Sequence, residues 1–112
     1  MEKSYNFALR MIKLFQFLSG EKKEFVLSKQ LLRSGTSIGA NIEEANQAQS
    51  KADFIHKLSV ANKEAFETNY WLRLLHDSEI LTEKQAESLL NDCVELQKLL
   101  TASIKTSKND TQ

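Results

Sequence analysis

The sequence contains no proline, three glycines and one cysteine among its 112 residues. The many turns of a β-sandwich or barrel need more glycine and proline than this chain has. Only 8% of the residues are aromatic, whereas Leu, Glu, Lys, Gln and Ala, which favour helix, are frequent. We therefore predict an all-α fold, and the length suits one domain with a modest core.

The chain also lacks a long hydrophobic run. Its longest stretch without a charged residue, Ser34–Ile42, has nine residues, whereas a membrane-spanning helix needs about 20. The first residues mix charged and apolar side chains without a small-residue cleavage site, so no secretory signal is expected. These absences predict a cytoplasmic protein without a membrane partner.

The single cysteine, Cys93, cannot form an internal disulfide, and a zinc site built from cysteines is excluded. This agrees with a reducing compartment. Cys93 lies on the apolar stripe of its predicted helix, so we expect a core side chain and not a nucleophile.

Hydrophobic residues recur with helical period in four segments. The predicted helices cover Tyr5–Ser19, about Phe25 to Gln49, Lys51 to about Asp77, and the residues from Thr82 to about 105. Short connections between them favour an antiparallel up-down-up-down four-helix bundle. We expect residues 1–105 to form this single domain and residues 106–112 to be a disordered tail, because the tail has no apolar anchor.

Three local signals refine these helices. Gly20 is expected to cap the first helix at its C-terminus. Ser50 and Thr82 are typical N-terminal caps, each with a suitable partner three residues later. Apolar residues of the first helix spread over roughly 220°, more than one bundle seam requires, so we expect this helix to be covered from two sides.

Gly35 and Gly39 lie one turn apart inside the second predicted helix. Each costs about 1 kcal/mol relative to alanine in a helix interior, so another interaction should offset them. Close approach of a second backbone is the simplest interpretation. A break in the helix at Gly35 is the alternative.

Catalytic and metal sites have little support in the sequence. The two histidines, His56 and His76, lie 20 residues apart, about 30 Å along one helix, and cannot share a metal within it. The paired Glu-x-x-His motifs of carboxylate-bridged metal sites are absent. Convergence of Glu43, Glu44, Glu64 and Glu67 is the remaining way to build such a site. We predict no catalytic residue and no cofactor.

Polar residues form a second stripe beside the apolar seams of the second and third helices. Glu64 and Glu67 alternate with apolar residues, which is unusual for a fully solvated face. The guanidinium of Arg33 suits a carboxylate partner. We predict a structural polar network or a subunit interface, or alternatively a solvated charged face, from Arg33, Ser37, Asn41, Glu44, Glu64, Glu67 and Trp71.

Positive charge is concentrated near the N-terminus, where residues 1–33 hold seven basic and three acidic side chains. Clustered positive charge can bind phosphates even in a neutral protein. The candidate nucleic-acid contacts are Arg10, Lys13, Lys22, Lys23 and Lys29. The alternative is an ordinary solubilising face.

Residues 33–75 resemble the signature region of the 23S rRNA-intervening-sequence protein family, also called four-helix bundle proteins. The resemblance is carried by Arg33-Ser34, Ser37-Ile38, Asn41-Ile42, Glu44-Ala45, Lys63-Glu64, Glu67 and Tyr70-Trp71-Leu72. It implies a four-helix bundle that assembles into a ring-like homopentamer. It also implies subunit-facing roles for the broad apolar arc of the first helix and the mixed stripe of the third.

Some proteins of this family are encoded within insertions in bacterial large-subunit rRNA genes. A related group serves as accessory proteins of diversity-generating retroelements, which bind nucleic acid and a reverse transcriptase. The resulting hypothesis is a non-enzymatic bacterial oligomer that binds RNA or DNA through repeated basic surfaces. The alternative is an oligomeric scaffold for a protein partner, such as a reverse transcriptase, without nucleic-acid contact.

Overall fold

The computed structural model describes residues 2–110, and over that range the chain forms four helices and no strand. The helices are α1 (Glu2–Gly20), α2 (Leu27–Ala45), α3 (Lys51–Asp77) and α4 (Glu83–Asn109). The predicted all-α class is confirmed. None of these helices has both the length and the apolar character that a membrane span requires.

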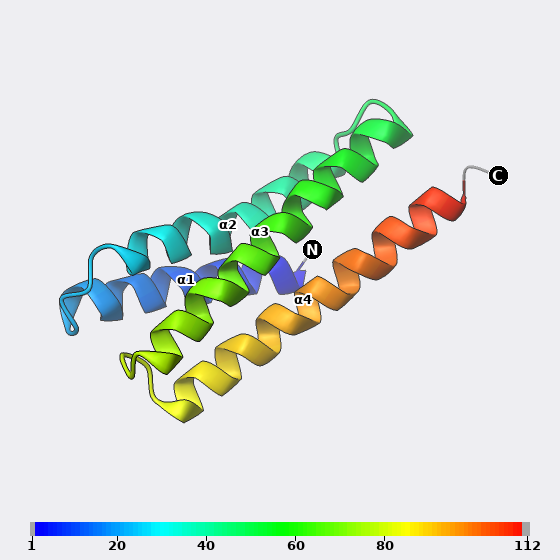
Figure 1. The fold of residues 1–112 in the computed structure, drawn as a ribbon. Helices are drawn as coiled ribbons and strands as arrows, with labels where there is room; N and C mark the ends of the chain where they lie inside the picture. Colours follow the sequence, from blue (N-terminus) through cyan, green and yellow to red (C-terminus); the bar gives the residue numbers. More distant parts are fainter. Residues whose placement is uncertain (1, 111–112) are drawn as a thin grey trace.

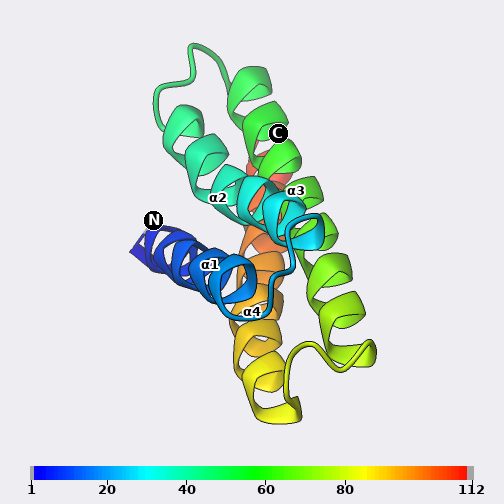
Figure 2. The same ribbon diagram turned by 90° about the vertical axis from the view of Figure 1, so that its left-hand side faces the viewer.

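Helices that follow one another in sequence also lie side by side, and the connections alternate between the two ends of the molecule (Figure 1). The α2–α3 and α3–α4 pairs pack most extensively. Figure 2 shows α1 inclined to the other helices. The contact between α1 and α4 is accordingly small.

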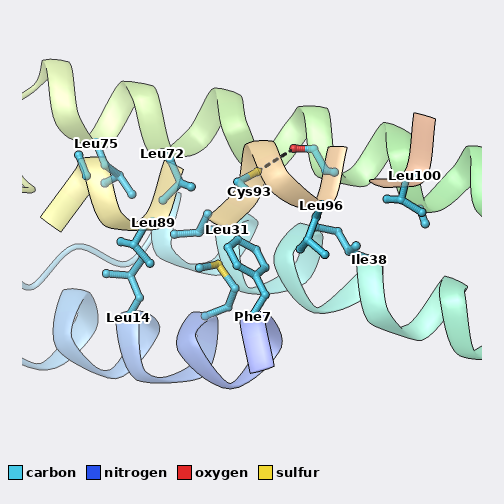
Figure 3. Close-up of a cluster of buried hydrophobic side chains, with 14 of the residues drawn as sticks. Phe7, Leu14, Leu31, Ile38, Leu72, Leu75, Leu89, Cys93, Leu96 and Leu100 are labelled. Atoms are coloured by element: carbon cyan, nitrogen blue, oxygen red, sulfur yellow. Dashed lines mark hydrogen bonds between the residues drawn. The ribbon is translucent and has the colours of Figure 1, made fainter. Parts of the chain in front are cut away.

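The core is a continuous cluster of aliphatic side chains from all four helices. Figure 3 shows Phe7 and Leu14 of α1 facing Leu31 of α2 and Leu89 and Leu96 of α4. Burying one Leu side chain contributes about 2 kcal/mol. The buried residues recur at helical spacing on one side of each helix, and they include Leu31 and Ile38 of α2, Leu58, Ala61, Ala65, Leu72 and Leu75 of α3, and Ala86, Leu89, Cys93, Leu96 and Leu100 of α4.

The broad apolar arc of α1 divides into two faces. Phe7 and Met11 are buried in the core, whereas Tyr5, Leu9 and Ile12 form an exposed stripe at helical spacings of four and three. The single chain therefore covers α1 from one side only.

Both helical glycines lie where α1 crosses α2, and α2 runs unbroken through them. A Cβ atom at Gly39 would lie 3.4 Å from the backbone oxygen of Ser4, so the two backbones approach closely there. At Gly35 the neighbour is a side chain, and a Cβ atom would lie 2.7 Å from Met11 Sδ. Close approach of a second backbone is confirmed at Gly39, whereas at Gly35 a side chain approaches instead. The alternative of a broken helix is wrong.

The ends of the first two helices differ from the prediction. Gly20 is the last residue of α1 and has no positive φ; the left-handed residue is Lys23, with φ 55°. α2 ends at Ala45, four residues before the predicted Gln49. There the backbone bonds tighten from the helical pattern to Gln47 N–H with Glu44 O and Ala48 N–H with Ala45 O, so the helix closes in a tight turn.

The third and fourth helices begin at their expected caps. Ser50 accepts from Asp53 N–H at 3.0 Å, and Thr82 forms a reciprocal capping box with Gln85. The predicted disordered tail is wrong for residues 106–109, because α4 continues to Asn109. No glycine or proline interrupts the helix there, so its own backbone bonds extend it beyond the core. Residues 111 and 112 lie outside the described residues.

Candidate functional site

The candidate nucleic-acid residues fall into two groups. Lys13, Lys22, Lys23 and Lys29 are exposed on α1, on the α1–α2 connection and at the start of α2. Within residues 2–110, none of these four lysines takes part in an ion pair. We call them the lysine cluster. Lys22 Nζ lies 5.8 Å from the ring centroid of Phe17, which leaves its charge on the surface.

Arg10 belongs to the second group, because its guanidinium connects α1 to α4. Its Nη1 donates to Asp92 Oδ2 at 2.5 Å, and its Nη2 donates to Ser88 Oγ at 3.0 Å. Lys3 is paired with Glu95 in the same way, one α4 turn further on. Arg10 is therefore partly neutralised and cannot offer its full charge to a phosphate.

The α1–α2 connection is held by Glu24, whose role the sequence did not reveal. Its carboxylate accepts from the backbone N–H groups of Val26, Leu27 and Ser28, at 3.2, 2.9 and 2.7 Å. A carboxylate at a helix N-terminus also interacts favourably with the helix dipole. The charge of Glu24 is thus directed to α2, although it lies beside Lys22 and Lys23 in sequence.

The predicted polar network is centred on Arg33. Its Nη1 donates to Glu64 Oε1 at 3.2 Å, its Nη2 donates to Glu67, and Trp71 Nε1 donates to Glu67 Oε2 at 3.1 Å. Desolvation lowers the pKa of Arg33, but the hydrogen bond to Glu67 and the charge of Glu64 outweigh it and raise the pKa above its usual value. The Arg33 side chain remains 48% exposed, so this is a surface cluster that links α2 to α3.

Ser37 and Asn41 do not extend this cluster across to α3. Ser37 Oγ donates to the backbone oxygen of Arg33, and Asn41 Nδ2 donates to the backbone oxygen of Ser37. Both bonds satisfy α2 itself, as short polar side chains within helices often do. Within one chain these two residues therefore do not join the polar network between α2 and α3, and their predicted role at a subunit interface stays a prediction.

Two further polar contacts connect α2 to α3. The hydroxyl groups of Ser34 and Thr68, both fully buried, are hydrogen-bonded at 2.9 Å. Lys57 Nζ donates to Glu44 Oε1 at 2.8 Å, and this hydrogen bond raises the pKa of Lys57. Polar side chains therefore do connect α2 to α3, and one of the main contacts is a buried hydroxyl pair that the sequence did not predict.

A groove between α3 and α4 was not expected from the sequence. Its volume is about 610 Å³, and its lining includes Phe66, Arg73, Val94, Lys98 and Lys105. We call it the α3–α4 groove. The sequence signal that could have indicated it is the seven-residue spacing of Phe66 with Arg73 and of Lys98 with Lys105, since this spacing places each pair on one side of its helix.

The structure also places the residues that were considered for metal binding and for nucleophilic catalysis. In that range no three His, Cys, Asp or Glu side chains are arranged to hold a metal ion, and the suggested convergence of Glu43, Glu44, Glu64 and Glu67 is not found. Cys93 is fully buried, and desolvation raises the pKa of its thiol to about 12. Its Sγ donates to the backbone oxygen of Ala65 at 3.3 Å.

Comparison with known proteins identifies similar sequences and structures. The sequence model of the 23S rRNA-intervening sequence protein matches residues 1–102. A crystal structure from Bacteroides thetaiotaomicron, described as a protein with unknown function from the S23 ribosomal protein family, is 60% identical and has a TM-score of 0.92. The alignment covers 93% of each chain. No match is found among curated proteins.

Proposed function

This chain belongs to the 23S rRNA-intervening sequence protein family, and we propose that it is a non-enzymatic oligomer that binds RNA or DNA through repeated basic surfaces. In this proposal the helices form an antiparallel up-down-up-down bundle, and five copies close into a ring in the bacterial cytoplasm. The lysine cluster contacts phosphates without reading base sequence, because the chain has no recognised base-reading motif.

The lysine cluster is the observation that carries the proposal. Its four side chains are exposed, and none of them belongs to an ion pair within residues 2–110. Lys3 and Arg10, which lie on α1 like Lys13, are instead paired with carboxylates of α4. Lys13 lies about 10 Å along α1 from its end, so all four charges are near the α1–α2 connection. The carboxylate of Glu24 is hydrogen-bonded to the start of α2, so its negative charge offsets the lysine charges less than its position in sequence suggests.

Self-association is supported by the exposed stripe of α1. Tyr5 is 62% exposed, and Leu9 and Ile12 are more than two-fifths exposed on the same face. Apolar side chains grouped in this way favour a contact with another protein surface. A ring would repeat the lysine cluster in every subunit, and simultaneous contacts would raise the affinity for a long polyanion.

A protein scaffold is the second candidate function, and two exposed apolar residues between Lys23 and Lys29 favour it. Phe25 and Val26 are 52% and 72% exposed, directly beyond Lys23 and Glu24. An apolar pair next to a charged loop suits a protein partner, such as the reverse transcriptase that the family resemblance suggests. In that case the lysines contribute solubility only.

Light scattering tests the assembly. We expect a particle of five times the 12.8 kDa chain mass, and Leu9→Gln with Ile12→Gln should reduce it to smaller species. Val26→Gln, which replaces a still more exposed apolar residue outside the stripe, is the control. A monomeric parent protein would refute the assembly.

Titration with labelled duplex DNA and structured RNA at two salt concentrations tests the binding. We expect the affinity to fall steeply with salt, and Lys22→Glu with Lys23→Glu to weaken binding at least tenfold. Lys51→Glu with Lys84→Glu changes the net charge equally at exposed sites outside the cluster and should have little effect. If both double variants bind like the parent protein, the lysine cluster is not the contact. A pentamer that binds neither nucleic acid favours the scaffold function instead.

A further inference from the structure

The α3–α4 groove combines positive charge with apolar and amide surface. Arg73, Lys98 and Lys105 supply three cations, and no carboxylate contributes to the lining. Asn69, Gln97 and Thr101 supply hydrogen-bonding groups between them. The helices on either side lie next to each other along their length (Figure 1). A ligand that fits this surface is negatively charged and carries both flat apolar and polar parts.

The cations are spaced along the groove. Lys98 and Lys105 are seven residues apart on α4, about 10.5 Å along the helix axis. This distance is about three phosphate steps of a stacked single strand, at roughly 3.4 Å per nucleotide. Arg73 faces them from α3, where its Nε donates to Asn69 Oδ1 at 2.8 Å. The guanidinium is thus oriented by a neutral partner and keeps its charge available.

Two aromatic rings lie on the same stripe of α3 as Arg73. Phe66 is 58% exposed in the lining of the groove, and Tyr70, one turn later, is 49% exposed. The Tyr70 ring is packed edge to face against Trp71, with centroids 5.2 Å apart, and Arg73 Cζ lies 5.8 Å from its centroid. Exposed rings beside cations are the surface on which bases of single strands stack.

The amide groups of the groove have fixed orientations. Asn69 Nδ2 donates to Gln97 Oε1 at 3.2 Å, and Gln97 is 9% exposed. Thr101 Oγ1 in the lining accepts from Nδ2 of Asn62, which lies outside the lining, at 3.3 Å. The lining thus adds oriented amide and hydroxyl groups to the aliphatic side chains of Val94 and Ala102, and these polar groups suit the edges of bases.

We propose that the α3–α4 groove binds single-stranded nucleic acid, with phosphates on Lys98, Lys105 and Arg73 and a base stacked on Phe66. This inference rests on the proposed nucleic-acid binding, but it uses none of the lysine cluster and adds a strand preference. Duplex nucleic acid does not fit the site, because its bases are already stacked and paired inside the helix.

Fluorescence anisotropy with labelled oligothymidylate and a DNA duplex of equal length tests the groove. We expect Lys98→Gln with Lys105→Gln to weaken binding of the single strand and to reduce the slope of log K against log salt by about 1.4, or 0.7 for each lost phosphate contact. The control, Lys51→Gln with Lys84→Gln, should leave the slope unchanged.

The aromatic contact is tested by Phe66. Phe66→Ala should weaken single-strand binding at least about fivefold without changing the salt slope, and Phe66→Trp should restore the affinity. Phe66 is exposed, so these variants are expected to fold, and circular dichroism verifies this. Loss of binding in Phe66→Trp as well would contradict stacking.

The outcomes separate this inference from the proposed function. Duplex binding that depends on Lys22 and Lys23, together with groove variants that bind oligothymidylate like the parent protein, would overturn the groove and leave the proposed function standing. No binding of either nucleic acid by the parent protein would overturn both. The inference would also be overturned if the duplex displaced oligothymidylate with equal affinity. The same holds if the groove bound only an acidic helical peptide.

Discussion

The substitution Gly35→Ala tests how α1 packs on α2. The added Cβ atom would lie 2.7 Å from Met11 Sδ, and closer still to Met11 Cγ. Met11 is fully buried and cannot move into solvent. The methionine side chain must therefore change its conformation or push α1 away from α2.

The expected magnitude follows from two opposing effects. Replacing glycine by alanine in a helix interior stabilises it by about 1 kcal/mol, whereas overpacking a core costs about 1–3 kcal/mol. We expect Gly35→Ala to lower the free energy of unfolding by about 1 kcal/mol. At Gly39 a Cβ atom would meet Ser4 O at 3.4 Å, an ordinary contact, so Gly39→Ala should raise the free energy of unfolding by up to about 1 kcal/mol.

Urea unfolding followed by circular dichroism measures both variants, at one protein concentration because assembly affects apparent stability. The helix propensity gain is common to both, so the difference of about 2 kcal/mol isolates the contact with Met11. In a Met11→Ala background, Gly35→Ala should become stabilising, as a double-mutant cycle shows. Equal stabilisation by Gly35→Ala and Gly39→Ala in the parent chain would refute the packing described for Met11.

Three further predictions concern other sites. Glu24→Ala should lower the free energy of unfolding by about 1 kcal/mol in urea titration, because three backbone N–H groups lose their acceptor; an unchanged midpoint would contradict this role. Arg33→Ala should cost less than about 1 kcal/mol in the same assay, because its partly exposed ion pairs are screened, and a larger loss would indicate a buried network. Cys93, with a thiol pKa raised to about 12, stays protonated below that pH and should resist iodoacetamide at pH 8 until the protein is unfolded, as mass spectrometry would detect; rapid alkylation of folded protein would contradict its burial.

The helix faces could be predicted from the sequence because burial follows the helical period. The seams through Leu31 and Ile38, and through Leu58 and Leu72, are buried as expected. The caps at Ser50 and Thr82 were also predictable, since the cap and its partner lie three residues apart in sequence.

The first connection could not be predicted in the same way. A lysine seldom has positive φ, so Lys23 gave no signal, and glycine at position 20 suggested the wrong residue. Glu24 accepts from backbone N–H groups two to four residues later, much as an N-cap side chain does, but glutamate is not among the residues that are preferred at N-caps. Local propensity does not determine such a loop.

The polar contacts and the groove depend on which helices meet. The sequence predicts the partners of Arg33 by charge type, but Ser37 and Asn41 can bond to their own helix or to a neighbour, and only packing decides between these. Ser34 and Thr68 look like ordinary small residues in sequence, and their contact follows from the alignment of α2 and α3. The α3–α4 groove likewise forms between one stripe of α3 and one stripe of α4, and the sequence does not indicate that these two stripes face each other.

The hydroxyl pair of Ser34 and Thr68 restricts how α2 can slide along α3. A slip by one helical turn would shift one of the two oxygen atoms about 5.4 Å along the helix axis relative to the other. Each buried hydroxyl would then lose its partner across the interface and keep only a backbone oxygen of its own helix, that of Leu31 for Ser34 and that of Glu64 for Thr68. The lost hydrogen bond is worth about 0.5–1.5 kcal/mol. An all-aliphatic seam would tolerate such a slip more readily. The pair therefore selects one register, and with it the alignment that brings Arg33 to Glu64 and Glu67 on the surface.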